Sequence, residues 1–329
     1  MTSTYKAHDT SRPLHIVFLG CGNITNTHTK NARKADSKVL LSYASRTLAK
    51  AEGYVKKHRG HKAYGSYEEA MADPSVDVVM INTPPDSHYQ LAQQAIAAHK
   101  HVIIEKPPFF QSSDFDILGP KADELGLQML IAENYYYRPL RQQIADAIAS
   151  GVIGKPLFVQ INATKKQKSK GDWREDESIA GYGALYEGGI HWANFVNNIG
   201  LEVTKVTGYQ PIKDVQLERS MQVVAETKEG AVINLLYSWE VDTLLFGLRL
   251  SRVYGTEGSI TFESNGVLTV IRGNKKRVRL PSIANITGGK PMWVDFLQAI
   301  KSGQAAQFTW QMAQRDLQYV EQAYGIVAE

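Results

Sequence analysis

The triplet Glu105-Lys106-Pro107 places a lysine directly after the apolar run 101–104. Partial burial beside another cation lowers the pKa of an amine, so Lys106 could donate a hydrogen bond to a substrate oxygen. The prolines restrict the chain here, and Pro107 or Pro108 could follow a cis peptide bond that aims the lysine. The alternative interpretation is a surface lysine in a proline turn.

A second pattern combines an acid and a histidine four residues apart, Glu187 and His191, with Asn194 one turn further on. Residues at this spacing share one side of a helix. A carboxylate can orient an imidazole and stabilise its charged form, which makes a general acid/base pair. The intervening Gly188 and Gly189 weaken a helix and indicate that a ligand approaches its backbone. The alternative is a core histidine in an internal helix.

The segment 20–25 reads GCGNIT and lies between a short apolar run and a helical stretch. This is the position of a dinucleotide-binding loop, in which Gly20 allows a tight turn and Gly22 lets the backbone approach a pyrophosphate at the helix start. The third glycine position holds Thr25. The candidate cofactor contacts are Gly20, Gly22, Asn23 and Ile24. The alternative is a plain strand–helix turn that binds nothing, with Cys21 as a small loop residue.

The second predicted strand ends at Ser45-Arg46-Thr47, where NAD-selective sites carry an acid for the ribose 2′-hydroxyl. No carboxylate stands there. Ser45 can donate a hydrogen bond, and Arg46 can pair with a phosphate and stack on adenine. The sequence therefore favours NADP(H), with NAD(H) possible if Arg46 is only a solvated surface charge.

In open parallel sheets, ligands bind beyond the carboxyl ends of the strands. Three conspicuous segments follow predicted strands here: 82–88, 105–107 and 133–135. His88 is interpreted as a helix-start or cofactor-edge residue and not as a base. The candidate cofactor contacts in these segments are Thr83, Pro84, His88, Glu105, Lys106 and Asn134.

Strand-like and helix-like stretches alternate up to about residue 134, which predicts a doubly wound parallel sheet with helices on both faces. The helix that begins near Ser112 is expected to be interrupted near Pro120. After residue 135 the pattern changes to a few helices, including 185–198, and long strand-like runs joined by short turns, which predict an open, mostly antiparallel sheet. We therefore expect an α/β protein with a Rossmann domain over 1–134 and an α+β domain for substrate binding and oligomerisation over 135–329.

Composition narrows the function classes. The 329 residues include 37 Lys and Arg against 33 Asp and Glu, and this small excess gives no case for nucleic-acid or membrane-surface binding. The single cysteine excludes an internal disulfide framework and a thiolate zinc cluster, and no metal site is expected. No signal-peptide or membrane-spanning pattern is present, so the expected location is cytoplasmic.

Together these motifs resemble the glucose–fructose oxidoreductase / inositol dehydrogenase / MocA family over nearly the whole chain. The resemblance rests on the glycine loop, the Thr83-Pro84-Pro85 turn with His88, the Glu105-Lys106-Pro107 triplet, the Trp173-Arg174 pair and the glycine-rich element 181–191. It implies a nicotinamide enzyme acting on a sugar, polyol or keto-sugar, and a homodimer or homotetramer assembled through the second sheet. Lys106 matches the family's catalytic lysine and His191 its acid/base histidine.

The chain departs from the family pattern at Glu187 and Asn194, where aspartate is common. The resemblance implies hydride transfer between nicotinamide and substrate, in which Lys106 polarises the oxygen, His191 moves the proton and Glu187 orients His191. Candidate substrate contacts are Lys106, Tyr135, Trp173, Arg174, Tyr186, His191 and Asn194, although some of these aromatic residues could belong to the core.

Other function classes remain open at this stage. The same lysine, histidine and cofactor suit a redox-neutral NAD-dependent glycosidase or lyase that oxidises its sugar transiently. A catalytically silent nucleotide-sensing regulator is a second alternative, which the retained Lys106 and His191 disfavour. A transcription factor is disfavoured because the chain has no basic helix-turn-helix signature.

Overall fold

The computed structural model describes residues 5–167, 171–213, 215, 217–243, 247–273, 276–280 and 285–326. The chain forms two compact units. One comprises Met1–Glu133 with Gly289–Gln314, and the other comprises Asn134–Gly288 with Arg315–Glu329. The sequence analysis assigned everything after 134 to one domain, whereas 289–314 pack with the first unit because helix α9 (Gly289–Ser302) buries Trp293 and Phe296 there.

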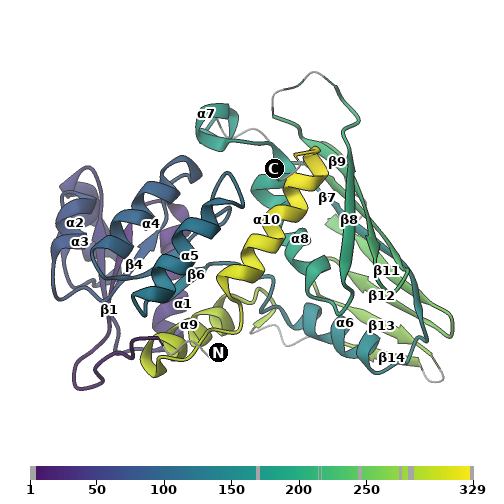
Figure 1. Ribbon diagram of the computed structural model, residues 1–329, viewed down its shortest axis with the longest axis horizontal. Coiled ribbons are helices and arrows are strands. Elements are labelled where there is room, and N and C mark those ends of the chain that lie inside the picture. The colour runs from purple at the N-terminus through teal and green to yellow at the C-terminus, as the bar shows by residue number, and fades with distance from the viewer. Residues whose placement is uncertain are drawn as a thin grey trace. The chain divides into compact units, whose positions relative to one another are not determined.

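A six-stranded parallel sheet forms the centre of the first unit, in the order β3-β2-β1-β4-β5-β6 (Figure 1). Four of its strands, β1, β4, β5 and β6, are fully buried, because crossover helices cover both faces. The predicted doubly wound sheet is confirmed, and its order reverses between β1 and β4. The strands are β1 (His15–Leu19), β2 (Leu40–Ala44), β3 (Ala63–Tyr64), β4 (Val78–Ile81), β5 (His101–Ile104) and β6 (Met129–Ile131).

Helices α1 (Asn23–Ala35), α2 (Leu48–His58), α3 (Tyr67–Ala72), α4 (His88–Ala97) and α5 (Asp114–Glu124) connect these strands, with a short 3₁₀ turn at Pro85–Ser87. The expected break at Pro120 is wrong, because α5 passes through it. Part of the helix-breaking effect of a proline is the clash of its ring with the Cβ of the residue before it. That residue is Gly119, which has no Cβ, and the buried Phe115, Leu118 and Ala122 hold the helix against the unit's core.

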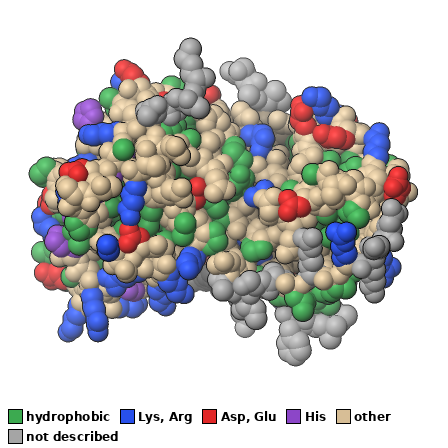
Figure 2. Space-filling view, turned by 90° about the horizontal axis from the view of Figure 1, so that it is seen from below, with side chains coloured by type: hydrophobic (Ala, Val, Ile, Leu, Met, Phe, Trp, Pro, Cys, Tyr) green, Lys and Arg blue, Asp and Glu red, His purple; other side chains and the backbone are tan. Residues whose placement is uncertain are grey.

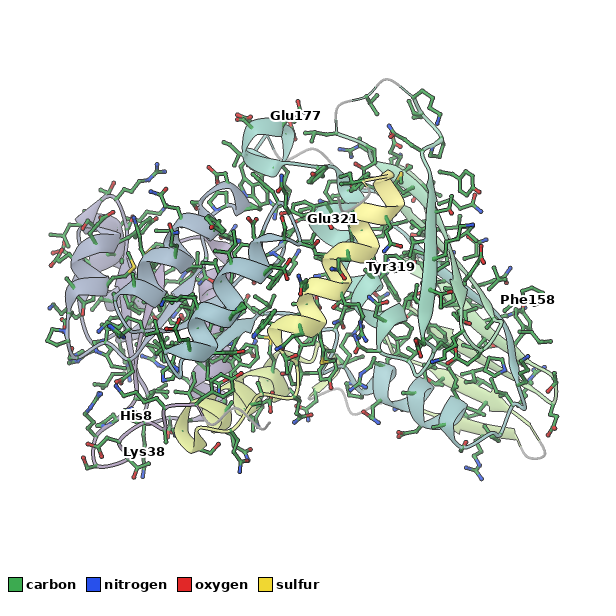
Figure 3. All side chains as sticks on the ribbon, viewed as in Figure 1. His8, Lys38, Phe158, Glu177, Tyr319 and Glu321 are labelled. Atoms are coloured by element: carbon green, nitrogen blue, oxygen red, sulfur yellow. The ribbon has the colours of Figure 1, made fainter. Side chains whose placement is uncertain are left out.

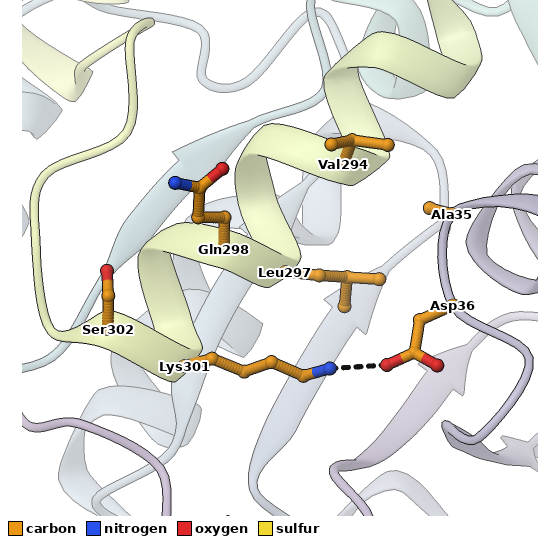
Figure 4. A pocket seen from close by; sticks show the side chains of 7 residues that line it. All are labelled: Ala35, Asp36, Val294, Leu297, Gln298, Lys301 and Ser302. Carbon is orange, nitrogen blue, oxygen red and sulfur yellow. Dashed lines mark hydrogen bonds and ion pairs between the residues drawn. The ribbon is translucent and has the colours of Figure 1, made fainter.

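Helix α9 packs against α1, where a lysine and an aspartate at the helix ends form an ion pair, Lys301 with Asp36 (Figure 4). A surface hollow of about 390 Å³ lies beside this pair, lined by Ala35, Asp36, Val294, Leu297, Gln298, Lys301 and Ser302. None of the predicted site residues lines this hollow.

An eight-stranded sheet forms the second unit, in the order β14-β13-β12-β11-β7-β10-β9-β8. Among the described strand pairs, only β7–β10 is parallel, so the predicted mostly antiparallel sheet is confirmed. The sequence analysis missed β8, whose run VTKVTGY carries a lysine and a glycine. The strands are β7 (Pro156–Thr164), β8 (Val203–Tyr209), β9 (Ser220–Thr227), β10 (Val232–Ser238), β11 (Leu250–Gly255), β12 (Ser259–Glu263), β13 (Thr269–Arg272) and β14 (Lys276–Arg279).

One face of this sheet is covered by helices and the other is not. Buried and exposed residues alternate along β10, as they do in a sheet with one solvent-facing side. Phe158 lies on the outer face and points away from the helices (Figure 3). The helical elements are α6 (Pro139–Ala149), η2 (Trp173–Glu175), α7 (Glu177–Ala180), η3 (Leu185–Gly189), α8 (Ile190–Asn197) and, from Arg315 on, α10 (Trp310–Tyr324).

Acidic and basic side chains are interspersed with apolar ones on the molecular face that Figure 2 views. Among the described residues, no helix is long and apolar enough to span a membrane.

Candidate active site

The glycine loop joins β1 to α1 where the strand order reverses. Gly20 has φ +96°, and a Cβ there would lie 3.1 Å from the Asn82 carbonyl oxygen. Both the backbone conformation and the lack of space therefore disfavour any other residue at this position. At Gly22, which caps α1, no described heavy atom lies within 4 Å of the Cβ position. The backbone at this helix start therefore leaves room for an anionic group, the kind of ligand that a helix N-terminus favours. Asn23 and Ile24 are exposed beside it.

Thr25 replaces the third glycine and ties the loop to two neighbouring elements. Its side chain is fully buried. Its hydroxyl donates to the Gly20 carbonyl oxygen at 2.7 Å and accepts from Asn82 Nδ2 at 3.2 Å. Asn82 Oδ1 is buried and has no hydrogen-bond partner among the described residues. An unsatisfied acceptor at the end of β4, next to the glycine loop, suits a ligand that brings a donor.

Cationic side chains flank the end of β2. Ser45 is buried there and accepts from the Thr47 N–H at 3.4 Å, while Arg46 is exposed. Lys50, in the first turn of α2, is close enough to Cys21 to act on its thiol electrostatically. Leu48 is 47% exposed between these cations. An apolar side chain between two cations suits an adenine with a phosphate beside it. The sequence analysis did not single out Lys50.

Cys21 lies in the glycine loop and is buried. Burial raises the pKa of its thiol to about 11, so the thiol stays protonated at neutral pH. A protonated thiol is a poor nucleophile, which agrees with its interpretation as a small loop residue.

Lys106 follows β5 and is partly exposed. Its backbone N–H donates to Glu105 Oε2 at 2.7 Å, and the Lys106–Pro107 peptide bond is cis. Because β4 and β5 are parallel neighbours, the ends of both strands meet at one edge of the sheet. Thr83 and Pro84 lie partly exposed at that edge.

His88 joins the two strand ends from inside the unit. It is 1% exposed, its Nε2 lies 2.8 Å from the Thr83 carbonyl oxygen, and its Nδ1 lies 3.0 Å from that of Pro107. Burial lowers the pKa of this imidazole. The ring therefore clamps the turn after β4 to the turn after β5, and its burial leaves it no ligand-facing surface.

The second unit holds Glu187 in an ion-pair chain. Arg174 Nε donates to Glu187 Oε1 at 3.1 Å, and Arg174 Nη1 donates to Asp172 Oδ2 at 2.8 Å. The guanidinium also lies over the Trp173 ring, 4.4 Å from its centroid. Two carboxylates, those of Asp172 and Glu187, thus share the Arg174 guanidinium. Sequence reasoning missed Asp172, although it stands next to Trp173 in the chain.

His191 lies in the first turn of α8, and Tyr135 lies against it. The two rings stack with centroids 4.4 Å apart and planes 8° from parallel. The Arg138 guanidinium lies 4.3 Å from the Tyr135 centroid and donates to the carbonyl oxygens of Ser264, Asn265 and Ile286. Arg138 therefore holds the Tyr135 ring in place, and the His191 imidazole stacks on that ring.

The backbone between Glu187 and His191 is not a regular α-helix. Residues Leu185–Gly189 form a π-helical turn, which holds one residue more per hydrogen-bonded ring than an α-helix. A Cβ at Gly188 would lie 2.2 Å from the Tyr237 hydroxyl oxygen. The glycine thus makes room for a buried tyrosine of β10, where the sequence analysis expected a ligand.

Two candidate substrate residues are buried within the second unit. Asn194 is fully buried, and its Nδ2 donates to Asp316 Oδ2 at 2.6 Å. Tyr186 is fully buried, and its backbone N–H donates to the Tyr324 hydroxyl at 3.2 Å. Asn134 is partly exposed, and its Nδ2 donates to the Thr287 carbonyl oxygen at 2.5 Å. The Asn194 and Asn134 side chains, and the Tyr186 backbone, thus have structural partners inside their own unit.

The candidate residues thus form two sets, one in each unit. The first set is the glycine loop with Ser45, Arg46, Thr83, Pro84, Glu105 and Lys106, and the second is Tyr135, Trp173, Arg174, Glu187 and His191. In the described residues, no group of three or more His, Cys, Asp or Glu side chains is arranged to hold a metal ion.

Comparison with known proteins assigns both units to one family. A family model described as an oxidoreductase family with an NAD-binding Rossmann fold matches residues 14–133, and the GFO/IDH/MocA C-terminal domain model matches residues 141–261. The chain belongs to the glucose–fructose oxidoreductase / inositol dehydrogenase / MocA family of oxidoreductases, as its motifs predict.

Curated relatives match over part of their length. An uncharacterized oxidoreductase, ORF334, of Rhizobium meliloti is 32% identical over 48% of this chain and 47% of the relative. The 1,5-anhydro-D-fructose reductase of Ensifer adhaerens is 25% identical over 74% of each. The chain thus spans less than half the length of the first of these relatives.

Solved structures share the fold over nearly the whole chain. The aldose-aldose oxidoreductase of Caulobacter crescentus, complexed with glycerol, has a TM-score of 0.84 at 19% identity and covers 96% of this chain and 97% of its own. KijD10, a 3-ketoreductase of Actinomadura kijaniata in complex with NADP and TDP-benzene, has a TM-score of 0.78 at 21% identity, covering 93% and 95%. GenD2 from gentamicin A biosynthesis, in complex with NAD, has a TM-score of 0.80 at 22% identity, covering 98% and 96%.

Proposed function

We propose that this protein is an oxidoreductase that prefers NADP(H) and transfers hydride between nicotinamide and a sugar, polyol or keto-sugar. The observation that carries the proposal is the shared sheet edge of the first unit. Three neighbouring strands, β1, β4 and β5, end at this edge. The helix start at Gly22 follows β1, the Thr83-Pro84 turn follows β4, and Lys106 follows β5. Ligands of doubly wound sheets bind at this edge.

The residues at this edge fit a nicotinamide dinucleotide. Gly20, Gly22, Asn23 and Ile24 hold the pyrophosphate and its flanking groups, and Thr83, Pro84 and Glu105 line the nicotinamide side. Ser45, Arg46 and Lys50 hold the ribose 2′-phosphate, since a phosphate pairs with cations and a carboxylate there would repel it. The unpartnered Asn82 Oδ1 and the open Gly22 both suit an occupant.

When bound, the nicotinamide supplies the hydride chemistry, and the chain supplies positioning and electrostatics. Lys106 donates a hydrogen bond to the reacting oxygen. His191 takes or returns the hydroxyl proton, and the stacked Tyr135 fixes the plane of its ring. Glu187, held by Arg174, supplies a carboxylate four residues from His191 in the sequence.

A neutral, hydroxyl-rich substrate suits the second unit's set. Trp173 offers an aromatic face, and Arg174 and Glu187 offer hydrogen-bonding groups of a kind that sugars use. The relatives that act on an anhydro-sugar and an aldose support this class. Because Asn194 and Tyr186 are fully buried, the proposal gives them a supporting role in place of direct contact with a sugar.

A titration and a substrate screen test this function. Fluorescence titration with NADPH and NADH should give saturable binding that is tighter for NADPH. A screen of polyols with NADP⁺ and of keto-sugars with NADPH should then show turnover at 340 nm. Lys106→Ala should lower that turnover by about 10²- to 10⁴-fold while NADPH still binds. Unchanged turnover contradicts the role of Lys106, and release of free sugar from a glycoside without net NADPH change identifies the redox-neutral reaction.

We also propose that two or four copies assemble through the outer face of the eight-stranded sheet. Exposed apolar side chains gather on that face: Phe158, Tyr209, Val232, Leu236, Leu250 and Val278 are each between 38% and 57% exposed. Large exposed apolar patches of this kind mark protein interfaces. Light scattering after size exclusion should show a dimer or tetramer, and Phe158→Lys should shift it toward the monomer. A monomeric wild type contradicts the proposal.

A further inference from the structure

A chain of buried hydrogen bonds leads from helix α9 to the backbone of Lys106. Trp293 Nε1 donates to His28 Nδ1 at 3.0 Å, and His28 Nε2 lies 2.7 Å from Glu105 Oε1. The other carboxylate oxygen, Oε2, accepts from the Lys106 N–H at 2.7 Å. Trp293 is 0%, His28 4% and Glu105 8% exposed, so water does not compete for these bonds.

The chemistry of the partners fixes the direction of every bond. An indole N–H can only donate, so His28 Nδ1 must carry the lone pair. The hydrogen of a neutral imidazole is then on Nε2 and points at the Glu105 carboxylate. The Trp293 indole therefore selects one tautomer of His28, and that tautomer binds one of the two Glu105 oxygens.

The Glu105 carboxylate binds the backbone at the end of β5. The Glu105 N–H still donates to the Ile81 carbonyl oxygen at 3.0 Å, in the ladder between β5 and β4. The next N–H, that of Lys106, turns to the Glu105 side chain. The carboxylate thus sets the backbone from which the Lys106 side chain departs.

The chain also passes through the helix that carries the glycine loop. His28 lies in α1, whose first residue follows Gly22, and its ring contacts Trp293 edge to face with centroids 5.8 Å apart. Trp293 packs in turn beside Phe18 of β1. Hydrogen bonds in such an apolar setting are strengthened by the low local dielectric.

We propose that His28 and Trp293 are positioning residues for Lys106, acting through the Glu105 carboxylate. The inference rests on the proposed function of Lys106. His28 holds Glu105, and Trp293 holds the tautomer of His28 that can do so. Since α1 begins at the glycine loop, the same helix places both the dinucleotide loop and the lysine.

Four variants of the full chain test this inference. His28→Leu removes both ring hydrogen bonds, whereas His28→Gln keeps an N–H donor near the Nε2 position. Trp293→Phe removes only the indole donor. Trp310→Phe is the matched control. Like Trp293, Trp310 donates its indole N–H to a side chain of the first unit, but its acceptor is Asp123 Oδ2, at 3.3 Å, and Asp123 is not part of the chain of bonds that leads to Lys106. Circular dichroism and thermal melting establish that each variant folds.

Two spectroscopic measurements on the protein without ligand decide the outcome. Amide hydrogen exchange at Lys106 should be about tenfold faster or more in His28→Leu, closer to wild type in His28→Gln, and unchanged in Trp310→Phe. The imidazole ¹⁵N spectrum of wild type should show neutral His28 as the Nε2–H tautomer, and Trp293→Phe should mix the tautomers.

Three results overturn the inference. The first is an unchanged Lys106 exchange rate in folded His28→Leu. The second is an equal loss of protection in His28→Gln and His28→Leu, since ring bulk would then be what matters. The third is an Nδ1–H tautomer in wild type, which also decides the matter if His28→Leu does not fold. These results are independent of the turnover of Lys106→Ala, so failure of the inference and failure of the proposed function are distinguishable.

Discussion

Tyr135 and His191 stack face to face, with ring centroids 4.4 Å apart and planes 8° from parallel. Tyr135 is itself held by Arg138, which is buried and bonded to three carbonyl oxygens. The stacked Tyr135, itself held by Arg138, therefore helps to orient the candidate acid/base residue, while the acid at position 187 is paired with Arg174. A carboxylate four residues away in the sequence is only one of the ways in which a histidine can be oriented.

Replacement of Tyr135 tests whether the stack supports catalysis. Tyr135→Phe keeps an aromatic face against His191 and should retain most of the turnover of the wild type. Tyr135→Leu removes the stack, which is worth about 0.5–1.5 kcal/mol, and should lower kcat by about 2- to 10-fold. Steady-state kinetics with a substrate from the screen provide the measurement. Equal kcat values for the Leu variant and the wild type would show that the imidazole does not depend on Tyr135.

Arg46 is the test of cofactor preference. Arg46→Ala removes one charge-assisted hydrogen bond to the 2′-phosphate, and NADPH affinity should fall by about 10- to 100-fold. NADH affinity should stay within about twofold, because NADH lacks that phosphate. Lys38→Ala is the control, since Lys38 is an exposed cation after α1 and outside the candidate site. Parallel loss of both cofactors would mean that Arg46 supports the fold or the adenine instead of the phosphate.

Much of the first unit could be predicted because its information is local. The apolar runs of β1, β4 and β5, and the glycines and prolines that end them, are read from neighbouring residues. The alternation of strands and helices, the position of the glycine loop and the location of Lys106 after β5 follow from these same local patterns. Pro120 was misjudged because its effect depends on the residue before it, Gly119, which lacks the Cβ that would clash.

The second unit depends more on contacts between distant residues. Nothing near Gly188 in the sequence announces the Tyr237 hydroxyl, which arrives from β10. The helical spacing of Glu187, His191 and Asn194 suggested one shared face, but the π-helical turn changes the register, and Asn194 binds Asp316 of α10. His28 and Trp293 were also not singled out, because their partnership joins residues 265 positions apart.

The contact between Gly188 and Tyr237 gives a stability prediction that needs no substrate. Gly188→Ala places a methyl group 2.2 Å from the Tyr237 hydroxyl oxygen, and it should lower the free energy of unfolding by about 1–3 kcal/mol. Tyr237→Phe in the same chain removes that oxygen, and the next ring atom lies at an ordinary contact distance of 3.4 Å. The double variant should therefore recover part of the loss.

Tyr237→Phe alone should cost about 1 kcal/mol, since the Trp239 indole N–H then loses its acceptor at 3.0 Å. Urea unfolding of the wild type, both single variants and the double variant completes the cycle. A favourable coupling between the two changes is the expected result. Strictly additive losses would show that the methyl group at 188 is accommodated without meeting the tyrosine.

Glu218 makes stability depend on pH. It is 4% exposed, its Oε1 accepts from the Leu185 N–H at 2.7 Å and the Tyr324 hydroxyl at 3.0 Å, and burial raises its pKa from 4.5 to about 7. Between these values the folded chain binds a proton that the unfolded chain has released, so this group's contribution falls as pH rises from about 4.5 through about 7. Over this pH range, the contribution of Glu218 to the free energy of unfolding falls by about 3 kcal/mol in total.

Glu218→Gln tests this dependence, because the amide oxygen can still accept from Leu185 and Tyr324 but no longer titrates. Relative to wild type, the variant should gain up to about 3 kcal/mol of stability at pH 8 and gain little at pH 5. Urea midpoints measured from pH 5 to pH 8 give the comparison, with the exposed Glu226→Gln as a control that should run parallel to wild type. If the urea midpoint of Glu218→Gln also changes with pH as that of wild type does, Glu218 has the same pKa in the folded and unfolded chains. The hydrogen bond from the Leu185 N–H to Glu218 is then insensitive to pH.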